Sequence, residues 1–255
     1  MNIYKGRAEV ISQEMISENI YDLRIASPQA AGEARPGQFV SLYCNDRTRL
    51  LPRPISICGI DREKGILRLV YRIAGRGTAE FSGLKPGETL DIMGPLGNGF
   101  PMTDKPAILV GGGIGIPPML ELARQLPGEK HIVLGYRDQT FLLDEFRRLA
   151  SLSIATEDGS LGAKGTVLDA IEQDQVKGQV LYACGPMPML KALSAYAREK
   201  GIEAWISLEE RMACGIGACL GCIISSKDKD AHSNVHNKRI CKDGPVFNAG
   251  EVNFS

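Results

Sequence analysis

Four cysteines near the C-terminus have the spacing of metal ligands. Cys214, Cys219 and Cys222 lie close together among glycines, and Cys241 follows after a longer gap. The spacing C-x4-C-x2-C with one distant cysteine is that of plant-type [2Fe-2S] sites. A zinc ribbon more often offers two separate short cysteine pairs. We therefore expect a [2Fe-2S] cluster here, and a zinc site or unrelated packing are the alternatives.

The three other cysteines are isolated. Cys44, Cys58 and Cys184 lie in apolar or strand-like stretches, and core packing is the simpler interpretation for the first two. The total of seven cysteines is odd, and the N-terminus has no apolar run of the kind found in signal peptides. We therefore expect reduced thiols, no disulfide framework and a cytoplasmic protein.

A glycine-rich turn follows an apolar, strand-like run. The sequence AILVGGGIGIPPML continues into a helix whose start is marked by two prolines. The glycines of this turn are Gly111, Gly112, Gly113 and Gly115. Such a turn lets a phosphate approach the N-H groups of a helix N-terminus. The sequence is not G-x-G-x-x-G, so a tight strand-to-helix turn without a ligand is the alternative.

A second strand end supports the phosphate-binding interpretation. In LYACGPMPML, residues Cys184, Gly185 and Pro186 separate a strand-like run from a helical one. Open parallel sheets place ligands at such strand ends. Packing alone would account for Cys184 equally well.

Two stretches in the first hundred residues favour binding of a phosphate-bearing ligand. Arg53 and Ser56 lie three apart in the apolar run RPISI, and the planar guanidinium of an arginine suits a pyrophosphate. An arginine on the surface of an edge strand is the alternative. Downstream, Tyr71 offers a ring for stacking, and Gly75, Gly77 and Thr78 precede a short helical pattern.

The elements that carry these residues divide the chain into three regions. Up to about residue 100, short alternating runs separated by turn residues predict an antiparallel barrel or sandwich. From about residue 105, strand and helix patterns alternate, which is typical of a parallel sheet flanked by helices. After about residue 206 neither pattern continues, and cysteine and glycine dominate. A metal centre would organise a segment this small.

Composition excludes several classes of partner. The chain has 255 residues, with 30 Lys and Arg against 30 Asp and Glu. Because the charges balance and no basic patch is built, we expect no nucleic-acid partner. No segment approaches the ~20 apolar residues of a membrane span, so we expect no membrane partner.

The motifs occur in an order that resembles a known superfamily. R-x-x-S, G-x-G-T, MGPLGNGF, GGGIGIPP and CGP follow one another as in ferredoxin-NADP reductase-like flavoproteins. This resemblance covers residues 1 to about 205. With the C-terminal cysteine segment added, the chain resembles the electron-transfer subunits of class 1B dihydroorotate dehydrogenases, which act in pyrimidine biosynthesis.

The resemblance implies three domains with one cofactor each. Residues 1–101 would be an antiparallel FAD-binding barrel, residues 102–206 a parallel-sheet NAD-binding α/β domain, and residues 207–255 a small [2Fe-2S] domain. It also implies a separate FMN-containing catalytic subunit, in a heterotetramer. The polar loop before Cys241 looks longer than in the family, and we interpret it as an insertion that leaves the ligands in place.

The resemblance assigns site residues as follows. The flavin segments are Arg53, Pro54, Ile55 and Ser56, with Val70, Tyr71 and Arg72. The arginine would contact the pyrophosphate and the serine the region of the flavin ring, while Gly77 and Thr78 form the phosphate-contacting pair. The predicted nicotinamide contacts are Gly111, Gly112, Gly113, Gly115, Cys184, Gly185 and Pro186. The predicted cluster ligands are Cys214, Cys219, Cys222 and Cys241.

The three expected domains, with FAD, NAD and a [2Fe-2S] cluster, together predict an oxidoreductase subunit. FAD must join a two-electron nicotinamide to a one-electron cluster. The histidines His131, His232 and His236 form no pattern for acid-base chemistry on a dihydropyrimidine, so that chemistry is expected on the partner and no catalytic residue is expected here.

Other functions remain open on sequence alone. An NAD(P)H-linked ferredoxin or sulfite reductase subunit has the same modules. A zinc-organised nucleotide-binding module and a stand-alone diaphorase are further alternatives. Arg137 would suit a 2'-phosphate and Asp138 a free ribose hydroxyl, and the resemblance favours NAD over NADP.

Overall fold

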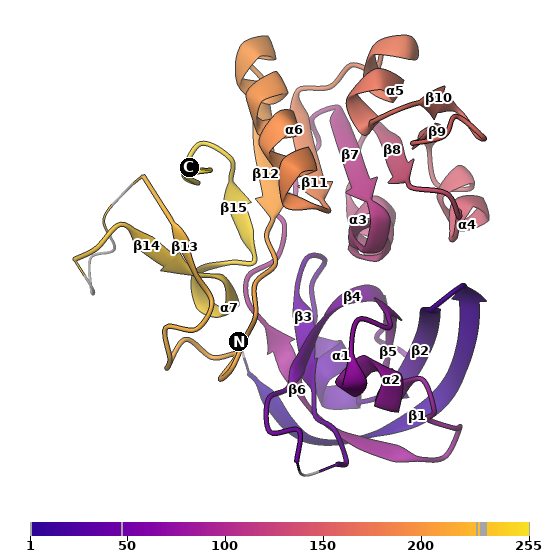
Figure 1. The fold of residues 1–255 in the computed structure, drawn as a ribbon, viewed down its shortest axis with the longest axis vertical. Coiled ribbons are helices and arrows are strands. Elements are labelled where there is room, and N and C mark those ends of the chain that lie inside the picture. The colour runs from indigo at the N-terminus through magenta and orange to yellow at the C-terminus, as the bar shows by residue number, and fades with distance from the viewer. Residues whose placement is uncertain (1, 47, 228, 230–233, 255) are drawn as a thin grey trace. The chain divides into compact units, whose positions relative to one another are not determined.

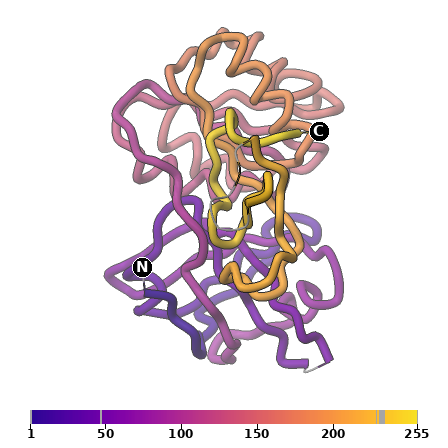
Figure 2. Tube along the Cα trace, turned by 90° about the vertical axis from the view of Figure 1, so that its left-hand side faces the viewer, coloured from indigo at the N-terminus to yellow at the C-terminus, as the bar shows by residue number. Residues whose placement is uncertain are grey.

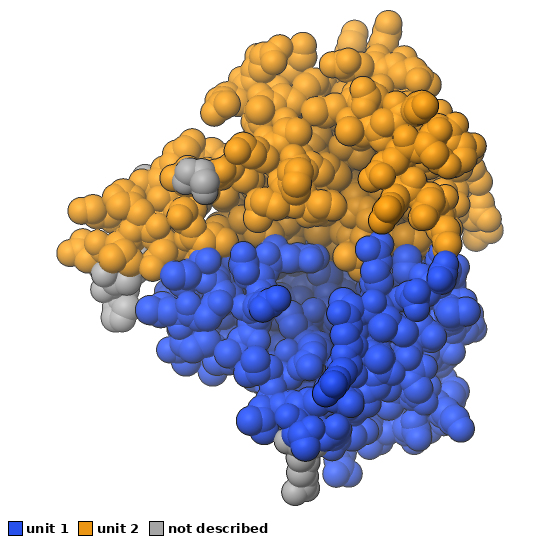
Figure 3. Space-filling view, viewed as in Figure 1, with its two compact units in different colours: residues 1–99, 209–223, 239–245 blue, residues 100–208, 224–238, 246–255 orange. Residues whose placement is uncertain are grey.

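The chain forms two compact units in a computed structural model that describes residues 2–46, 48–227, 229 and 234–254. Unit 1 comprises residues 1–99, 209–223 and 239–245, and unit 2 comprises residues 100–208, 224–238 and 246–255 (Figure 3). The segment 207–255, for which we predicted a separate domain, is thus shared between the two units. No helix among the described residues is long and apolar enough to cross a membrane.

Unit 1 is built on a closed antiparallel barrel, as the alternating runs predict. Its strands are β1 (Tyr4–Ser17), β2 (Ile20–Ala26), β3 (Phe39–Leu42), β4 (Arg53–Asp61), β5 (Ile66–Arg72) and β6 (Thr89–Leu96). They close in the order β1-β2-β5-β4-β3-β6. Side chains from alternate positions, such as Leu23, Leu67 and Leu69, fill the barrel and are fully buried.

Two short helices accompany the barrel (Figure 1). They are α1 (Pro28–Glu33) and α2 (Arg76–Phe81). Ala30 and Ala31 of α1 and Phe81 of α2 are buried in the barrel's apolar core. Helix α2 is therefore held against the barrel by its last residue, while its first turn follows directly from the loop after β5.

Unit 2 contains the predicted parallel sheet. Its strands are β7 (Ala107–Gly112), β8 (Lys130–Tyr136), β9 (Ser151–Thr156), β10 (Ala163–Lys164), β11 (Val180–Cys184), β12 (Glu203–Ser207) and β15 (Val246–Asn248). The order is β10-β9-β8-β7-β11-β12-β15, and every pair is parallel except β12 with β15. The strand β15, which our reading of the sequence did not predict, comes from the C-terminal segment and covers one sheet edge.

Helices connect the parallel strands of unit 2 (Figures 1 and 2). They are α3 (Ile116–Gln125), α4 (Leu143–Arg147), α5 (Val167–Gln173) and α6 (Met187–Lys200), and the one-turn η1 (Gly113–Gly115) precedes α3. The central strands β7 and β11 are buried along their whole length. Continuous apolar runs such as AILV and VLYA are what a strand covered on both faces requires.

The C-terminal segment has little regular structure. It contains the two-stranded sheet of β13 (Ile223–Ser225) and β14 (Asn237–Arg239), followed by α7 (Ile240–Asp243). The polar loop that we interpret as an insertion joins β13 to β14. His232, one of the three histidines named above, lies outside the described residues.

Candidate functional site

The four C-terminal cysteines all belong to unit 1. We call residues 214–222 the cysteine loop; it contains Cys214, Cys219 and Cys222, and Cys241 lies on α7. Cys222 and Cys241 are buried, and Cys214 and Cys219 are half-buried. The N-H of Ile240 donates to the carbonyl of Cys222 over 2.9 Å, which joins the end of the loop to the start of α7. The structure thus brings the distant fourth cysteine to the other three.

Backbone N-H groups point at the sulfur atoms. The N-H of Cys219 donates to Cys214 Sγ over 3.3 Å, that of Gly217 to Cys241 Sγ over 3.1 Å, and that of Cys241 to Cys222 Sγ over 3.5 Å. Gly217 has φ +80°, and a Cβ there would lie 2.6 Å from the side chain of Lys242. Glycine is therefore required for the turn that aims this N-H at a sulfur.

The thiols of Cys214 and Cys241 have strongly shifted pKa values. Burial raises the pKa of the Cys214 thiol, but hydrogen bonds from the backbone N-H groups of Cys219, Ile216 and Ala218 outweigh it and lower that pKa to about 6. Burial, followed by the neighbouring Cys222 thiol, raises the pKa of Cys241 to about 12. A cationic metal centre would remove the cost of burying a thiolate at Cys241, because a coordinated thiol is deprotonated outright.

The donor set, four cysteine sulfurs with backbone N-H groups aimed at three of them, fits an iron-sulfur cluster. A [2Fe-2S] cluster spreads four thiolates over two irons, so no iron needs three protein ligands. The N-H groups aimed at sulfur are also the contacts by which a protein tunes such a cluster.

The two predicted flavin segments lie together in unit 1. Arg53 begins β4, and Gly77 and Thr78 lie in the first turn of α2. A Cβ on Gly77 would lie 2.4 Å from Arg53 Nε, so the guanidinium rests directly against this glycine. Arg53 also donates to the carbonyl of Leu51. The R-x-x-S and G-x-G-T motifs therefore lie next to each other, through Arg53 and Gly77.

The first turn of α2 is fixed by its own threonine. Thr78 Oγ1 accepts hydrogen bonds from the N-H groups of Ala74 over 2.8 Å and Gly75 over 3.2 Å. Thr78 Oγ1 also donates to the carbonyl of Gly75 over 3.1 Å, so this one side chain holds the loop that enters the helix. It leaves the following N-H groups of the turn to point away from the helix, as a phosphate site requires.

One expectation about this site is wrong: Tyr71 does not offer its ring for stacking on a ligand. The side chain is 1 % exposed and lies in the barrel core, with Tyr21 and Phe81 at ring-centroid distances of 5.8 and 6.4 Å. Its hydroxyl donates to Gln13 Oε1 over 2.9 Å, and burial raises its pKa. The residue sits on the inward face of β5, so it could meet a ligand only through its backbone.

Sequence reasoning missed Glu80, on the last turn of α2. Its Oε1 accepts the N-H groups of Asn45 over 2.5 Å and Asp46 over 3.3 Å, and its Oε2 accepts a hydrogen bond from Arg49. The carboxylate therefore ties the loop before β4 to the helix that carries Gly77 and Thr78. No local pattern marks a single glutamate in a short helix for this role.

The glycine-rich turn of unit 2, which we call the glycine turn (residues 111–115), meets the second predicted strand end. Strands β7 and β11 are neighbours, with Gly111 paired to Cys184. A Cβ on Gly115 would lie 2.4 Å from the carbonyl carbon of Cys184. The backbone of the two strand ends therefore touches, and only glycine permits that approach.

Four other side chains named from sequence make structural contacts or lie at the surface. Cys184 is fully buried, so its sulfur packs inside unit 2. Arg137 follows β8 and is largely exposed, with a long ion pair of 4.0 Å to Glu157. His131 Nε2 lies 2.7 Å from Ser153 Oγ, which donates to Asp174, and burial lowers the pKa of this histidine. His236 Nδ1 lies 2.8 Å from the carbonyl of Lys227, so the described histidines serve structural contacts.

Comparison with known proteins decides the family. An oxidoreductase FAD-binding domain model matches residues 7–100, and a model of the iron-sulfur cluster binding domain of dihydroorotate dehydrogenase B matches residues 209–253. A dihydroorotate dehydrogenase B (NAD(+)) electron transfer subunit of Geobacillus thermodenitrificans is 45% identical over 260 residues, covering 98% of this chain and 99% of that protein. The chain belongs to this family of electron transfer subunits.

Other similar proteins share either this name or the fold. A protein of the same name from Bacillus cereus (strain B4264) is 43% identical and covers 95% of this chain. A solved structure of an NADH-dependent reduced ferredoxin-NADP oxidoreductase matches with a TM-score of 0.87 and 33% identity, covering 97% of this chain and 90% of that one. A ferredoxin reductase of carbazole 1,9a-dioxygenase, 19% identical with a TM-score of 0.66, shares the fold.

As a member of the family of dihydroorotate dehydrogenase B electron transfer subunits, the chain is an oxidoreductase subunit with FAD and an iron-sulfur cluster as cofactors. The FAD-binding domain model covers Arg53, Ser56, Gly77 and Thr78. The iron-sulfur model covers all four cysteines of the cluster site.

Proposed function

We propose that this chain transfers electrons between NAD(H) and an FMN-containing dihydroorotate dehydrogenase subunit in pyrimidine biosynthesis. The observation that carries the proposal is the convergence of four cysteines, with three N-H to sulfur contacts, in a chain that belongs to the electron transfer subunit family. Bound FAD supplies the conversion between hydride transfer and single-electron transfer.

In the proposed flavin site, the residues of this chain bind FAD and orient it. Arg53 supplies a cationic fork against Gly77, where a pyrophosphate gains charge-assisted hydrogen bonds. Gly77 and Thr78 supply the N-H groups at the start of α2. Pro54, Ile55 and Ser56 of β4 and Val70 and Arg72 of β5 complete the proposed flavin segments, with Tyr71 contributing backbone alone.

In the cluster site, Cys214, Cys219, Cys222 and Cys241 are the proposed ligands of a [2Fe-2S] cluster. The N-H groups of Gly217, Cys219 and Cys241 stabilise negative charge on the sulfurs. The partly exposed Cys214 and Cys219 are the ligands nearer to solvent, and the buried Cys222 and Cys241 shield the other side.

In the nicotinamide site, the glycine turn and residues 184–186 form the proposed NAD contacts. Apart from the half-buried Ile114 and the exposed Pro186, these residues have no side chain or a buried one, so we expect recognition there to use mainly backbone groups at the carboxyl edge of the parallel strands. The choice of NAD follows the name of the relatives, dihydroorotate dehydrogenase B (NAD(+)).

We infer further that the catalytic partner carries FMN and that the two subunits assemble as a heterotetramer. The described residues offer no acid-base pair for a dihydropyrimidine, which supports a separate catalytic subunit. A ferredoxin-linked role is the second candidate, because the 33% identical structure bears that name; the 45% identity to dihydroorotate dehydrogenase subunits favours the first.

The test is reconstitution with the catalytic subunit. The purified pair should reduce NAD+ when given dihydroorotate without oxygen, measured by NADH absorbance, and neither subunit alone should do so. Reduction of ferredoxin by NADPH with this chain, and no NAD+ reduction by the pair, would overturn the proposal in favour of the second candidate.

A further inference from the structure

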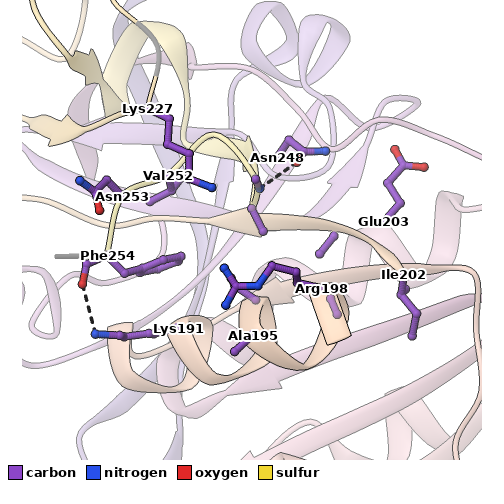
Figure 4. A pocket seen from close by; sticks show the side chains of 15 residues that line it. Lys191, Ala195, Arg198, Ile202, Glu203, Lys227, Asn248, Val252, Asn253 and Phe254 are labelled. Atoms are coloured by element: carbon purple, nitrogen blue, oxygen red, sulfur yellow. Dashed lines mark hydrogen bonds between the residues drawn. The ribbon is translucent and has the colours of Figure 1, made fainter. Parts of the chain in front are cut away.

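A cavity of 530 Å³ lies in unit 2, on the side of α6 and the C-terminal residues (Figure 4). This volume falls within the range of small-molecule sites, about 300 to 1,000 Å³. Its walls come from four segments: residues 191–198 of α6, the start of β12, Lys227 shortly after β13, and the end of β15 with the residues that follow it. The lining residues used below are Lys191, Arg198, Glu203, Lys227 and Phe254.

The cavity is distinct from the proposed nicotinamide site. Helix α6 begins at Met187, beside the strand end at Cys184, and runs away from it. The cavity is lined by Arg198, near the last turn of α6, and by Glu203, at the first position of β12. Lys191, about one turn into α6, also lines it, so the cavity runs along this helix as far as the amino edge of the parallel sheet, whereas dinucleotides bind at the carboxyl edge.

The charges of the lining residues favour an anion. Figure 4 shows the side chains of Arg198 and Lys227 directed into the cavity, and neither has an ion-pair partner within the described part of the chain. Lys191 adds a third cation, which is held by a 3.2 Å hydrogen bond to the carbonyl of Phe254. The carboxylate of Glu203 is already engaged, by Trp205 Nε1 at 2.9 Å and Lys105 at 3.6 Å.

An aromatic ring gives the cavity a second kind of contact. Phe254 lines the cavity and is half-buried. The hydrogen bond from Lys191 to its carbonyl fixes the backbone that carries the ring. Small residues, Ala195, Ala204 and Gly250, form much of the remaining surface and leave room for a planar group. An arginine and a lysine beside an aromatic face match a ligand that joins a phosphate to a planar ring.

We propose that this cavity binds a nucleoside monophosphate or a similar ring-bearing phosphate. The Arg198 guanidinium and the Lys227 ammonium hold the phosphate, and Phe254 contacts the ring. The site is independent of the electron-transfer proposal, since none of its residues belongs to the flavin, cluster or nicotinamide sites.

The test is calorimetric titration of the cofactor-loaded protein with uridine monophosphate in the presence of saturating NAD+. Uridine monophosphate lacks adenine, and NAD+ blocks the dinucleotide site. Uridine monophosphate should bind more tightly than inorganic phosphate, and uridine without phosphate should bind far more weakly. Arg198→Gln should weaken binding about tenfold or more, and Phe254→Ala should remove the preference over inorganic phosphate.

Lys200→Gln is the matched control. Lys200 lies on the same helix but does not line the cavity, so this variant should bind like the parent. Rapid flavin reduction by NADH shows that each variant is folded. Absence of measurable binding, equal binding by Arg198→Gln and the parent, or complete displacement by NAD+ would each overturn the proposal.

Discussion

The cysteine loop and the glycine turn are both short segments rich in glycine, but they are held in place in opposite ways. The glycine turn follows a fully buried strand and touches the neighbouring buried strand at Cys184. The cysteine loop has no regular element of its own, and it is held by N-H groups donating to sulfur and by the backbone hydrogen bond from Ile240 to Cys222. The first is positioned by the protein core, whereas the second depends on what its sulfurs bind.

This difference predicts which site survives the loss of its ligand. Without dinucleotide, the glycine turn should keep its conformation because buried apolar strands hold it. Without iron, the cysteine loop should lose much of its order, because metal binding supplies the folding free energy of such segments.

The largest effect is expected for Cys219→Ala. This variant should contain almost no iron or sulfide, because removal of one of four thiolates leaves one iron undercoordinated. FAD content and flavin reduction by NADH should remain. Iron and sulfide analysis and electron paramagnetic resonance after reduction measure the loss. Cys44→Ala is the control and should keep its iron. A fully loaded cluster in Cys219→Ala would show that this residue is not a ligand.

Gly115→Ala tests the glycine turn in the same way. The new Cβ would lie 2.4 Å from the Cys184 carbonyl carbon, so the strand ends must separate. Overpacking of this kind costs roughly 1 to 3 kcal/mol. NADH should reduce the flavin roughly tenfold more slowly or worse in stopped-flow absorbance, with iron content unchanged.

Gly201→Ala provides a contrast for Gly115→Ala. Position 201 has φ +67°, so alanine there is strained, but no heavy atom lies within 4 Å of the added Cβ. This variant should lose stability yet keep fast flavin reduction. Fast reduction in Gly115→Ala as well would mean that the glycine turn does not position the nicotinamide.

Arg53→Ala should weaken FAD binding in unit 1. One charge-assisted hydrogen bond contributes roughly 1.5 to 3 kcal/mol, which corresponds to a 10- to 150-fold increase in the FAD dissociation constant. Titration of the apoprotein with FAD measures this dissociation constant, and the flavin content after desalting gives a second readout. Arg62→Ala removes a cation that donates to the Ala34 carbonyl and should leave FAD binding unchanged. Equal affinities in Arg53→Ala and the parent would make Arg53 a packing residue.

The smallest effect is expected for Glu80→Gln. The amide still accepts the N-H bonds from Asn45 and Asp46 but loses the charge that pairs with Arg49. The FAD dissociation constant should rise by a few-fold, as for loss of about 0.5 to 1 kcal/mol at a partly exposed ion pair. Glu88→Gln, whose carboxylate accepts the N-H of Lys85, is the matched control. If Glu80→Gln changes the constant no more than Glu88→Gln does, the loop before β4 does not position the flavin site.

Much of the fold could be predicted from sequence because its patterns are local. Alternation of apolar residues indicated the barrel, and strand-helix alternation indicated the parallel sheet. The cysteine spacing predicted that the four C-terminal cysteines lie together, as they do in the structure. Tyr71 was misjudged because an aromatic residue on a strand can face either way, and only the closed barrel shows that it points inward.

The missed features depend on contacts between distant residues. Glu80 acts on residues more than thirty positions earlier in the chain, so no spacing within its own helix reveals it. Strand β15 has only three residues, and its pairing with β12 joins segments some forty positions apart. Short strands of this kind are recognised only when a partner edge is known.

The antiparallel strand β15 limits how this protein can be rearranged by recombination. The segment that carries the cluster cysteines also supplies β15, which hydrogen-bonds to β12 through Trp205, Ile206 and Ser207. A gene cut after residue 208 would remove the cysteines and leave β12 as a bare edge, open to pairing with other chains. The iron-sulfur segment is therefore not a cassette that can be exchanged freely, because the sheet that it leaves behind would be incomplete.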